Sequence, residues 1–220
     1  MQTSDDHSGR RVSESNRVEA FSDGVLAIAL TLLVLDLHSD AARGDFGHEL
    51  TQQWPGYVAY LAAFLNIAAI WINHHDLFTR VRSVDTRLVG ANLLILLVAS
   101  LFPWPAAVMA AAVRTGDHHD QVISTVLYAG VGFCVPLAFI CVYTYLARHP
   151  DLLEHTRDAD YARLGARRSV ISVIVYPISA AVALIAPVAA LVAYVALPAY
   201  FIATLLISGK DGPAQQTRGS

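Results

Sequence analysis

The segment from Arg17 to Leu37 places the strongest constraint on how this chain can fold. It carries no charge from Gly24 to Leu35, and its length matches the roughly 20 residues that an α-helix needs to cross a hydrocarbon layer about 30 Å thick. The chain is 55% hydrophobic and only 15% charged, more apolar than a soluble domain of 220 residues can bury. We therefore predict an integral membrane protein whose first transmembrane helix is this segment.

The predicted first helix has two distinct faces when successive residues are turned by about 100°. One stripe contains Phe21, Gly24, Ile28, Thr31 and Leu35, and the other side contains Glu19, Asp23, Leu30 and Val34. The acidic side chain of Asp23 is therefore expected to point away from Ile28 and Thr31.

Further apolar stretches follow the first and bring the prediction to six transmembrane helices in an all-α fold. They cover about 54–78, 88–113, 121–147, 169–185 and 187–208. Pro103 and Pro105 are expected to end or kink the third span, because proline lacks the N–H that a helix interior needs. The last two spans are nearly contiguous, so we expect a tight antiparallel hairpin in which Pro187 opens the second helix.

The chain ends and the connectors are polar. Residues 1–16 and 209–220 are expected to be tails on a single transmembrane domain that spans 17–208. The first tail lacks the apolar core and cleavage site of a signal peptide, so we interpret it as a short disordered segment. Residues 38–53, 114–120 and 149–168 are expected to be loops.

The distribution of basic residues predicts the orientation. If the N-terminus is cytoplasmic, only Arg43 and Arg114 fall in outside loops, and every other arginine and the lysine fall inside. This bias predicts that both termini are cytoplasmic and that the number of spans is even.

Several classes of function find no support in the sequence. The net charge of −3 argues against nucleic acid as a partner. No nucleophile lies with a base or a metal triad at a common depth, and no metal or cofactor motif occurs, so we do not expect an enzyme. Cys134 and Cys141 lie about 10 Å apart on one predicted helix, too far to bridge, and we expect both thiols to be buried.

Polar residues gather near the cytoplasmic ends of the first three predicted spans. They are Arg17, Ser22, Asp23, His74, His75, Asp76 and Asn92. Left unpaired, each would cost several kcal/mol in apolar surroundings, so we expect them to bond to one another.

This cluster has two interpretations. It is either a proton or metal site built on the histidine pair and Asp23, or a packing network that joins three helices. Adjacent histidines point about 100° apart and no second histidine follows at i+4, which favours the packing network. Trp71, one turn before the histidines, is expected to be an interhelical packing and hydrogen-bonding group.

A family resemblance rests on these motifs. The pattern Arg17-x-x-x-Phe21-Ser22-Asp23 resembles the signature of the lysosomal potassium channel family, transmembrane protein 175, and of its single-repeat prokaryotic relatives. Residues 71–78 resemble the end of the family's second span, and residues 92–94 and 102–105 resemble its third span. Gly90, Trp104 and Ala106 depart from the family pattern, and the second half of the chain is similar in hydropathy alone.

The resemblance implies a potassium-permeable, moderately selective cation channel in a prokaryotic plasma membrane, with potassium as the permeant ion and no cofactor. Such a six-helix chain would form a homotetramer whose first helices line the pore. Ile28 would form the narrowest ring, Thr31 would offer hydroxyls one turn outward, and Leu35 would form a further apolar ring. The polar network would contain Arg17, Phe21, Ser22, Asp23, Trp71, His74 or His75, and Asn92.

Other functions stay open as alternatives. A carbonyl filter would show a TVGYG-like loop, and none occurs in the sequence. A secondary transporter would need an internal repeat or a midplane site, whereas the midplane of each predicted span is apolar. A proton-permeable pathway through His74, His75 and Asp23, or a purely structural membrane protein, are the remaining alternatives.

Overall fold

The computed structural model describes residues 3–37 and 46–208, and these residues form a bundle of helices. The elements are α1 (Thr3–Leu32), the 3₁₀ turn η1 (Leu33–Asp36), α2 (Phe46–Gln52), α3 (Trp54–Phe78), α4 (Thr86–Leu101), α5 (Pro103–Thr115), α6 (His118–Arg148), the 3₁₀ turn η3 (Pro150–Leu152), α7 (Asp158–Ala183) and α8 (Pro187–Ser208). A single antiparallel bridge joins Val81 to Leu153 within the described part of the chain. The predicted all-α class is confirmed.

The helices reproduce the predicted spans. Stretches long and apolar enough to cross a membrane are 15–35, 54–78, 86–115, 118–148 and 158–183, and a shorter apolar helix covers 187–203. The third span breaks where the prolines predicted a break, because α4 ends at Leu101 and α5 begins at Pro103. Phe102 at the break is buried and packs edge-on against Tyr128 at a ring separation of 5.5 Å.

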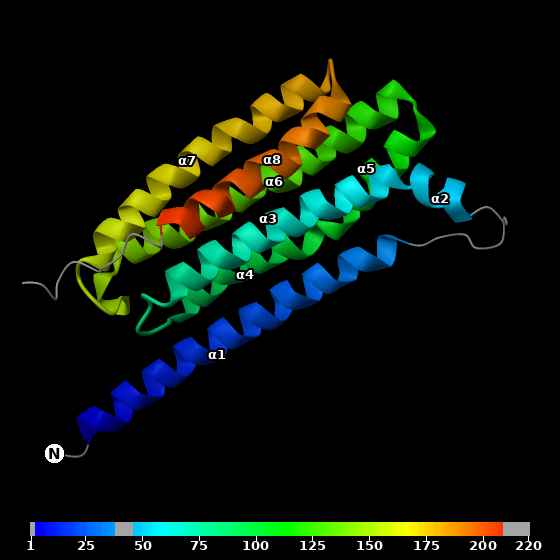
Figure 1. Cartoon of the computed structure of the whole chain (residues 1–220). Helices are drawn as coiled ribbons and strands as arrows, with labels where there is room; N and C mark the ends of the chain where they lie inside the picture. The colour runs from blue at the N-terminus through cyan, green and yellow to red at the C-terminus, as the bar shows by residue number, and fades with distance from the viewer. Residues whose placement is uncertain (1–2, 38–45, 209–220) are drawn as a thin grey trace, which may run out of the picture.

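The helices lie side by side along a common direction (Figure 1). Helix α1 lies along one edge and packs against α3 and α4, while α7 and α8 lie at the opposite edge and α6 packs closely against α7. Because consecutive spans run in opposite directions, the end of α3 and the start of α4 lie at the end of the bundle where α1 begins.

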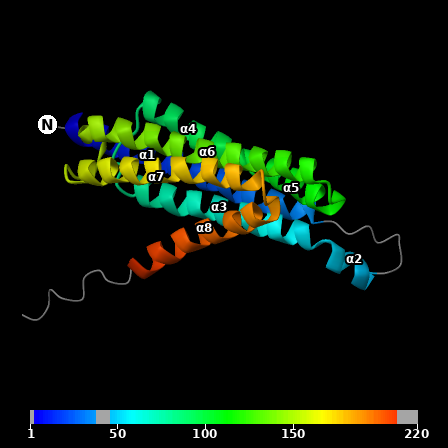
Figure 2. The same ribbon diagram turned by 90° about the horizontal axis from the view of Figure 1, so that it is seen from above.

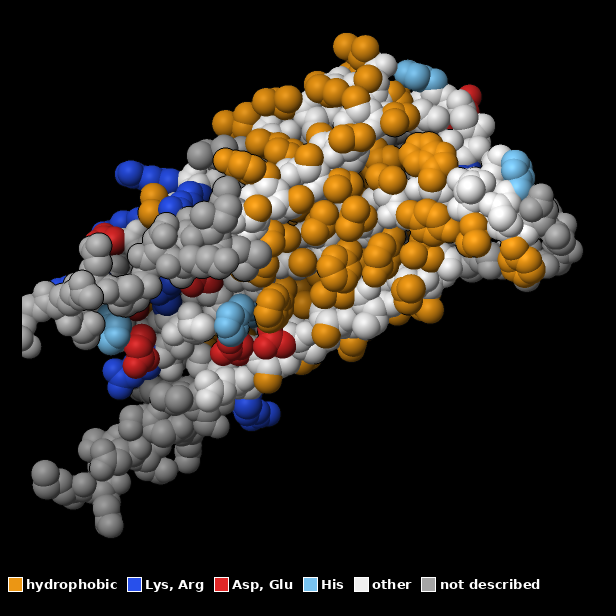
Figure 3. Space-filling model, in the orientation of Figure 1, with side chains coloured by type: hydrophobic (Ala, Val, Ile, Leu, Met, Phe, Trp, Pro, Cys, Tyr) orange, Lys and Arg blue, Asp and Glu red, His pale blue; other side chains and the backbone are white. Residues whose placement is uncertain are grey.

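Arginines concentrate at that end of the bundle. We call it the arginine-rich end, and its members include Arg17, Arg80, Arg82, Arg87, Arg148, Arg157, Arg163, Arg167 and Arg168, whereas Arg114 lies at the opposite end. Figure 3 shows this separation on one face, with basic side chains at the end where α1 begins and hydrophobic side chains over the middle. The apolar middle is what a helix bundle presents to hydrocarbon.

Three segments expected to be irregular are helical. Helix α1 begins at Thr3, so the expected disordered tail is helical from that residue, α2 interrupts the expected loop at 38–53, and α7 begins at Asp158 inside the expected connector. In α1 and α7 a polar segment continues an apolar helix, and extension costs far less than nucleating a new helix. The polarity of these segments therefore marks where the helices leave the membrane.

The two cysteines correct another expectation. Cys134 and Cys141 are free, as predicted, but both are exposed on α6. An apolar helix in a membrane has residues of similar polarity on its lipid-facing and its buried sides, so hydropathy alone does not identify the buried side.

Asn66 joins four helices inside the bundle. Its amide nitrogen donates to Ala62 O at 2.8 Å in α3, to the hydroxyl of Tyr128 in α6 at 3.1 Å and to the backbone carbonyl of Tyr194 in α8 at 3.3 Å. The hydroxyl of Tyr176 in α7 donates to Asn66 Oδ1 at 3.0 Å. One buried amide thus fixes how α6, α7 and α8 sit on α3.

Candidate functional site

Helix α1 packs on one side and is open on the other. Ile28 is 60% exposed and Leu35 is 67% exposed, while Leu26, Ala29 and Leu33 on the opposite side are almost completely buried. The other members of the stripe, Phe21, Gly24 and Thr31, are also exposed. The stripe that the sequence placed on one face is thus uncovered within a single chain.

The side of α1 opposite the stripe follows the prediction except where α1 passes into η1. Glu19, Asp23 and Leu30 are partly buried, whereas Val34 is 52% exposed. The buried side of α1 is centred on Leu26, Ala29 and Leu33, so Val34 lies at the edge of that side, about 100° around the helix from Leu33. The prediction is therefore wrong at Val34.

A buried chain of hydrogen bonds connects α1, α3 and α4. Asn92 Nδ2 donates to Ser22 Oγ at 2.8 Å, and His74 Nε2 lies 2.8 Å from Asn92 Oδ1. The hydroxyl of Ser22 donates to the carbonyl of Val18 in its own helix, also at 2.8 Å. Ser22, His74 and Asn92 are each nearly or completely inaccessible to solvent.

The donors and acceptors in this chain of hydrogen bonds define one arrangement of protons. Because Asn92 uses its amide to reach Ser22, its carbonyl oxygen faces His74, so His74 must carry a proton on Nε2. His74 Nδ1 is buried and has no hydrogen-bond partner among the described residues. A proton on Nδ1 would have no acceptor, so the neutral imidazole fits this site, and the ring stacks on Phe78 at 4.3 Å.

Two further contacts join α3 to α1 closer to the surface. Trp71 Nε1 donates to Asp23 Oδ1 at 3.0 Å, and His75 Nδ1 lies 3.2 Å from Glu19 Oε1. The rings of Trp71 and His75 stack at 5.7 Å, so the two contacts form one unit. The contact of His75 with Glu19 is thus separate from the buried chain of hydrogen bonds that contains His74.

Two members of the expected network, and Asp76 of the wider polar cluster, lie outside this arrangement. Arg17 and Phe21 are exposed, and neither makes a hydrogen bond, ion pair or ring contact with another described residue. Asp76 faces away from α1: it pairs with Arg80 at 2.9 Å and accepts a hydrogen bond from the hydroxyl of Tyr161 in α7. Asp76 follows His75 by one residue, and a rotation of about 100° is enough to point it at a different neighbour.

The geometry does not support a metal site in this cluster. Within the described residues, no group of three or more histidine, cysteine or carboxylate side chains is arranged to hold a metal ion. The site is therefore a set of interhelical hydrogen bonds rather than a coordination sphere.

The polar contacts of Asp85 at the arginine-rich end were not predicted from the sequence. Asp85 caps α4 by accepting from the backbone N–H of Leu88 at 2.8 Å, and it accepts from the hydroxyl of Tyr145 in α6. Burial raises the pKa of Asp85, but these two hydrogen bonds outweigh it and leave the pKa below its ordinary value. The cap has a recognisable signal, an aspartate just before an apolar helix, whereas a bond to a residue 60 positions away has none.

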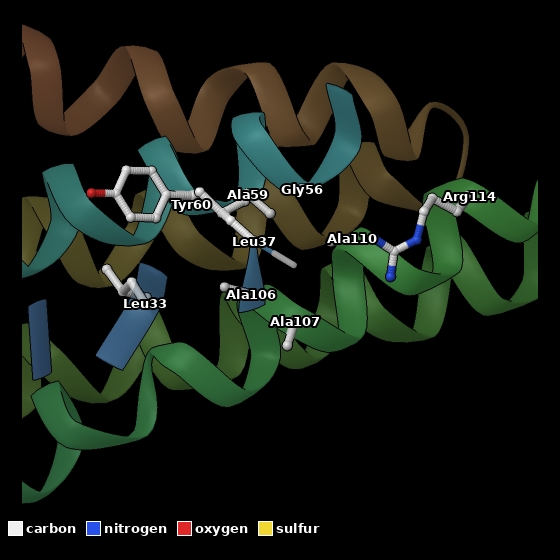
Figure 4. A pocket seen from close by; sticks show the side chains of 9 residues that line it. All are labelled: Leu33, Leu37, Gly56, Ala59, Tyr60, Ala106, Ala107, Ala110 and Arg114. Carbon is white, nitrogen blue, oxygen red and sulfur yellow. The ribbon is translucent and has the colours of Figure 1, made fainter. Parts of the chain in front are cut away.

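A small pocket lies beside η1, at the end of the bundle opposite the arginine-rich end (Figure 4). It measures about 70 Å³, and Leu33 and Leu37 face Gly56 and Ala59 of α3 and Ala106 of α5 across it. This pocket accommodates no more than a few water molecules. It offers no space for a larger ligand.

The fold and the site together define a class of protein. It is a multi-pass helical membrane protein whose first helix is fixed on one side by buried polar bonds and leaves an apolar stripe uncovered on the other. The family model of the endosomal/lysosomal potassium channel TMEM175 matches residues 17–103. The chain belongs to the TMEM175 family of channels, and it is not an enzyme.

Curated relatives and a solved structure support this assignment. A potassium channel of Streptomyces collinus is 38% identical over 192 residues, which cover 86% of this chain and 92% of that protein. A potassium channel of Chamaesiphon minutus is 33% identical over 66% of this chain and 72% of that protein. The crystal structure of a lysosomal potassium-selective channel TMEM175 homolog from the same organism superposes with a TM-score of 0.76 at 27% identity, covering 87% of this chain and 98% of that one.

Proposed function

We propose that this protein is a potassium-permeable, moderately potassium-selective cation channel whose pore is lined by α1 of each subunit in a homo-oligomer. The observation that carries the proposal is the uncovered stripe of Ile28, Thr31 and Leu35 on a helix fixed from behind. One chain supplies one such stripe, and a pore on a symmetry axis needs several, so a closed ring is required. A tetramer agrees with the resemblance to six-helix members of the family.

Exposure alone does not identify a pore helix. Helix α7 is even less covered, but its exposed side carries branched aliphatic residues such as Ile174, Ile178 and Val182, which suit lipid. The stripe on α1 instead combines Gly24 and the hydroxyl of Thr31 with apolar side chains. Small residues allow close approach of helices around an axis, and a hydroxyl offers oxygen to an ion.

The stripe suggests a mechanism for conduction. A ring of Ile28 side chains would form an apolar constriction in which water finds few partners, so it acts as a barrier even before it closes sterically. Thr31 Oγ1 donates to the carbonyl of Ile28 at 2.8 Å, which leaves the hydroxyl oxygen free to replace part of the water around an ion. Potassium loses water more readily than sodium, so such a ring favours potassium moderately, and Leu35 would form a further apolar ring.

The proposed setting is a prokaryotic plasma membrane with the arginine-rich end in the cytoplasm. Lysine and arginine are enriched on the cytoplasmic side of membrane proteins. Both termini would then be cytoplasmic, because α1 begins and α8 ends at that end of the bundle. A C-terminal tag accessible only from outside intact cells would contradict this orientation.

A flux assay on purified protein tests the function. Liposomes that contain the protein should release potassium down its gradient faster than sodium, and should not release a large organic cation. Flux should rise linearly with gradient and need no co-transported ion. Saturable flux that depends on a second ion would instead identify a transporter, and an active monomer would overturn the ring.

A further inference from the structure

A groove opens between the last two helices. α7 and α8 are joined by a short turn and diverge toward the arginine-rich end, as Figure 2 shows. A cavity of about 300 Å³ lies there, lined by residues of α3, α6, α7 and α8. This volume is at the lower end of the range for ligand sites, enough for part of an elongated molecule.

The N–H that Pro198 lacks allows Asn66 to fix the deep end of the groove. Pro198 in α8 has no N–H to give to the carbonyl of Tyr194 one turn earlier, and Asn66 of α3 donates to that carbonyl instead. Tyr176 of α7 bonds to the same Asn66. Both helices are thus fixed to α3 at this level and are free to separate beyond it, so the opening is built into the fold.

The lining changes character along the groove. Near Pro198 it is apolar, with Val175, Leu197 and Phe201. Toward the arginine-rich end it includes Asn73, whose Oδ1 accepts from Tyr143 at 3.0 Å while its amide nitrogen has no partner among the described residues. Ser172 adds an exposed hydroxyl that is likewise unpaired there. Unpaired donors at the edge of hydrocarbon favour an occupant with acceptor oxygens next to an apolar chain.

A positive charge completes the site. Arg168 precedes Ser172 by four residues and Val175 by seven, so it lies on the groove side of α7, about 6 Å along the helix from Ser172. It is exposed and forms no ion pair with a described residue. The nearby acid on α3, Asp76, is already paired with Arg80. The mouth of the groove therefore carries an uncompensated cation.

We propose that this groove binds an anionic phospholipid from the leaflet at the arginine-rich end. The acyl chain lies along Val175, Leu197 and Phe201, and the phosphate lies against the guanidinium of Arg168. The glycerol ester oxygens accept hydrogen bonds from Asn73 and Ser172. This binding is separate from ion conduction, because the groove lies on the side of α3 away from α1.

Native mass spectrometry of the purified oligomer tests the site by titration with phosphatidylglycerol and with phosphatidylcholine of the same acyl chains. We expect phosphatidylglycerol to bind more tightly, at one lipid per chain. Arg168→Gln should weaken its binding about fivefold, the effect of one charge near a membrane surface. Arg167→Gln removes the same charge from a neighbouring position turned about 100° around the helix, and should leave binding unchanged.

Two further variants separate the groove from its surroundings, and the oligomer mass in each spectrum reports folding. Ser172→Phe should fill the groove and abolish tight binding of either lipid. The proposal is overturned if both lipids bind equally well, or if both arginine variants lose binding equally. It is also overturned if removal of residues 209–220 creates tight binding that the full chain lacks, because the chain's own tail would then be the occupant.

Discussion

The indole nitrogen of Trp71 donates a 3.0 Å hydrogen bond to Oδ1 of Asp23, joining the second spanning helix to the first. Three residues later the same helix presents His74 to the buried chain that ends on Ser22. Helix α3 therefore contacts α1 directly through Trp71 and His75, and His74 reaches α1 indirectly through Asn92 of α4. The uncovered stripe of α1 is oriented by these contacts, although none of the residues that make them belongs to the stripe.

Removing Asp23 should harm assembly more than selectivity. Asp23→Ala removes the acceptor of the indole N–H of Trp71, a partly exposed hydrogen bond whose loss costs about 0.5–1.5 kcal/mol. We expect a lower yield of oligomer in size-exclusion chromatography and a lower melting temperature. The potassium-to-sodium flux ratio should be unchanged. A variant oligomer of normal yield with an altered flux ratio would show that Asp23 acts on the ions.

Asn92 should be the most sensitive member of the polar set. Asn92→Ala leaves His74 Nε2 without its acceptor and removes the donor to Ser22 Oγ, so a cost of about 2–5 kcal/mol is expected. Ser22→Ala is a milder control, because it removes one partner of Asn92 and leaves the bond to His74 intact. The melting temperature should therefore fall further in Asn92→Ala than in Ser22→Ala. Equal decreases in melting temperature would contradict the buried chain of hydrogen bonds.

A methyl group at Gly132 should disrupt the packing of α6 on α7. A Cβ at this position would lie 2.1 Å from Cε1 of Tyr176, and that ring is held by its bond to Asn66. Gly132→Ala should therefore destabilise the protein by about 1–3 kcal/mol. Gly130→Ala on the same helix is the matched control: a Cβ there meets no other atom within 4 Å, so stability should rise by up to about 1 kcal/mol.

Asp85 should stabilise the protein in a pH-dependent way. Its pKa in the folded chain is below the ordinary value of 3.8, so its contribution is complete above that pH and is lost as the pH falls through the folded pKa. Asp85→Ala should cost about 1 kcal/mol at pH 7, the usual value of a helix cap. Chemical unfolding at pH 7 and pH 3 should show the parent approaching the variant in acid, while Asp85→Asn keeps a cap without the pH dependence.

Helical periodicity and alternation predicted much of this fold. Period 3.6 placed Ile28 and Thr31 on one face of the first helix, and the alternating direction of spans placed Ser22, His74 and Asn92 at the same depth. Proline chemistry located the break between α4 and α5. These features depend on the regular geometry of single helices and on the order of the spans, and both can be predicted from the sequence.

Which side chains pair depends on how each helix is rotated about its own axis relative to its neighbours, and the sequence does not specify this rotation. The sequence pattern predicts that Asp76 joins the polar cluster of the first three spans, yet it bonds to Arg80 and Tyr161, because a rotation of about 100° separates it from His75. Hydropathy predicts that Cys141 is buried, yet it is exposed, because residues that face lipid and residues that face the protein core are equally apolar. The groove between α7 and α8 likewise depends on how far two helices diverge.

Ile28 is where the proposed pore is tested most directly. Replacing Ile28 by Asn should hydrate the ring, raise flux and reduce the preference for potassium over sodium in the liposome assay. Leu30→Asn is the matched control: Leu30 packs partly against the core, so this change should reduce oligomer yield instead. Thr31→Val should lower conduction by removing the hydroxyls that replace water around the ion. If a folded Ile28→Asn oligomer retains the parent flux and selectivity, Ile28 does not form the constriction.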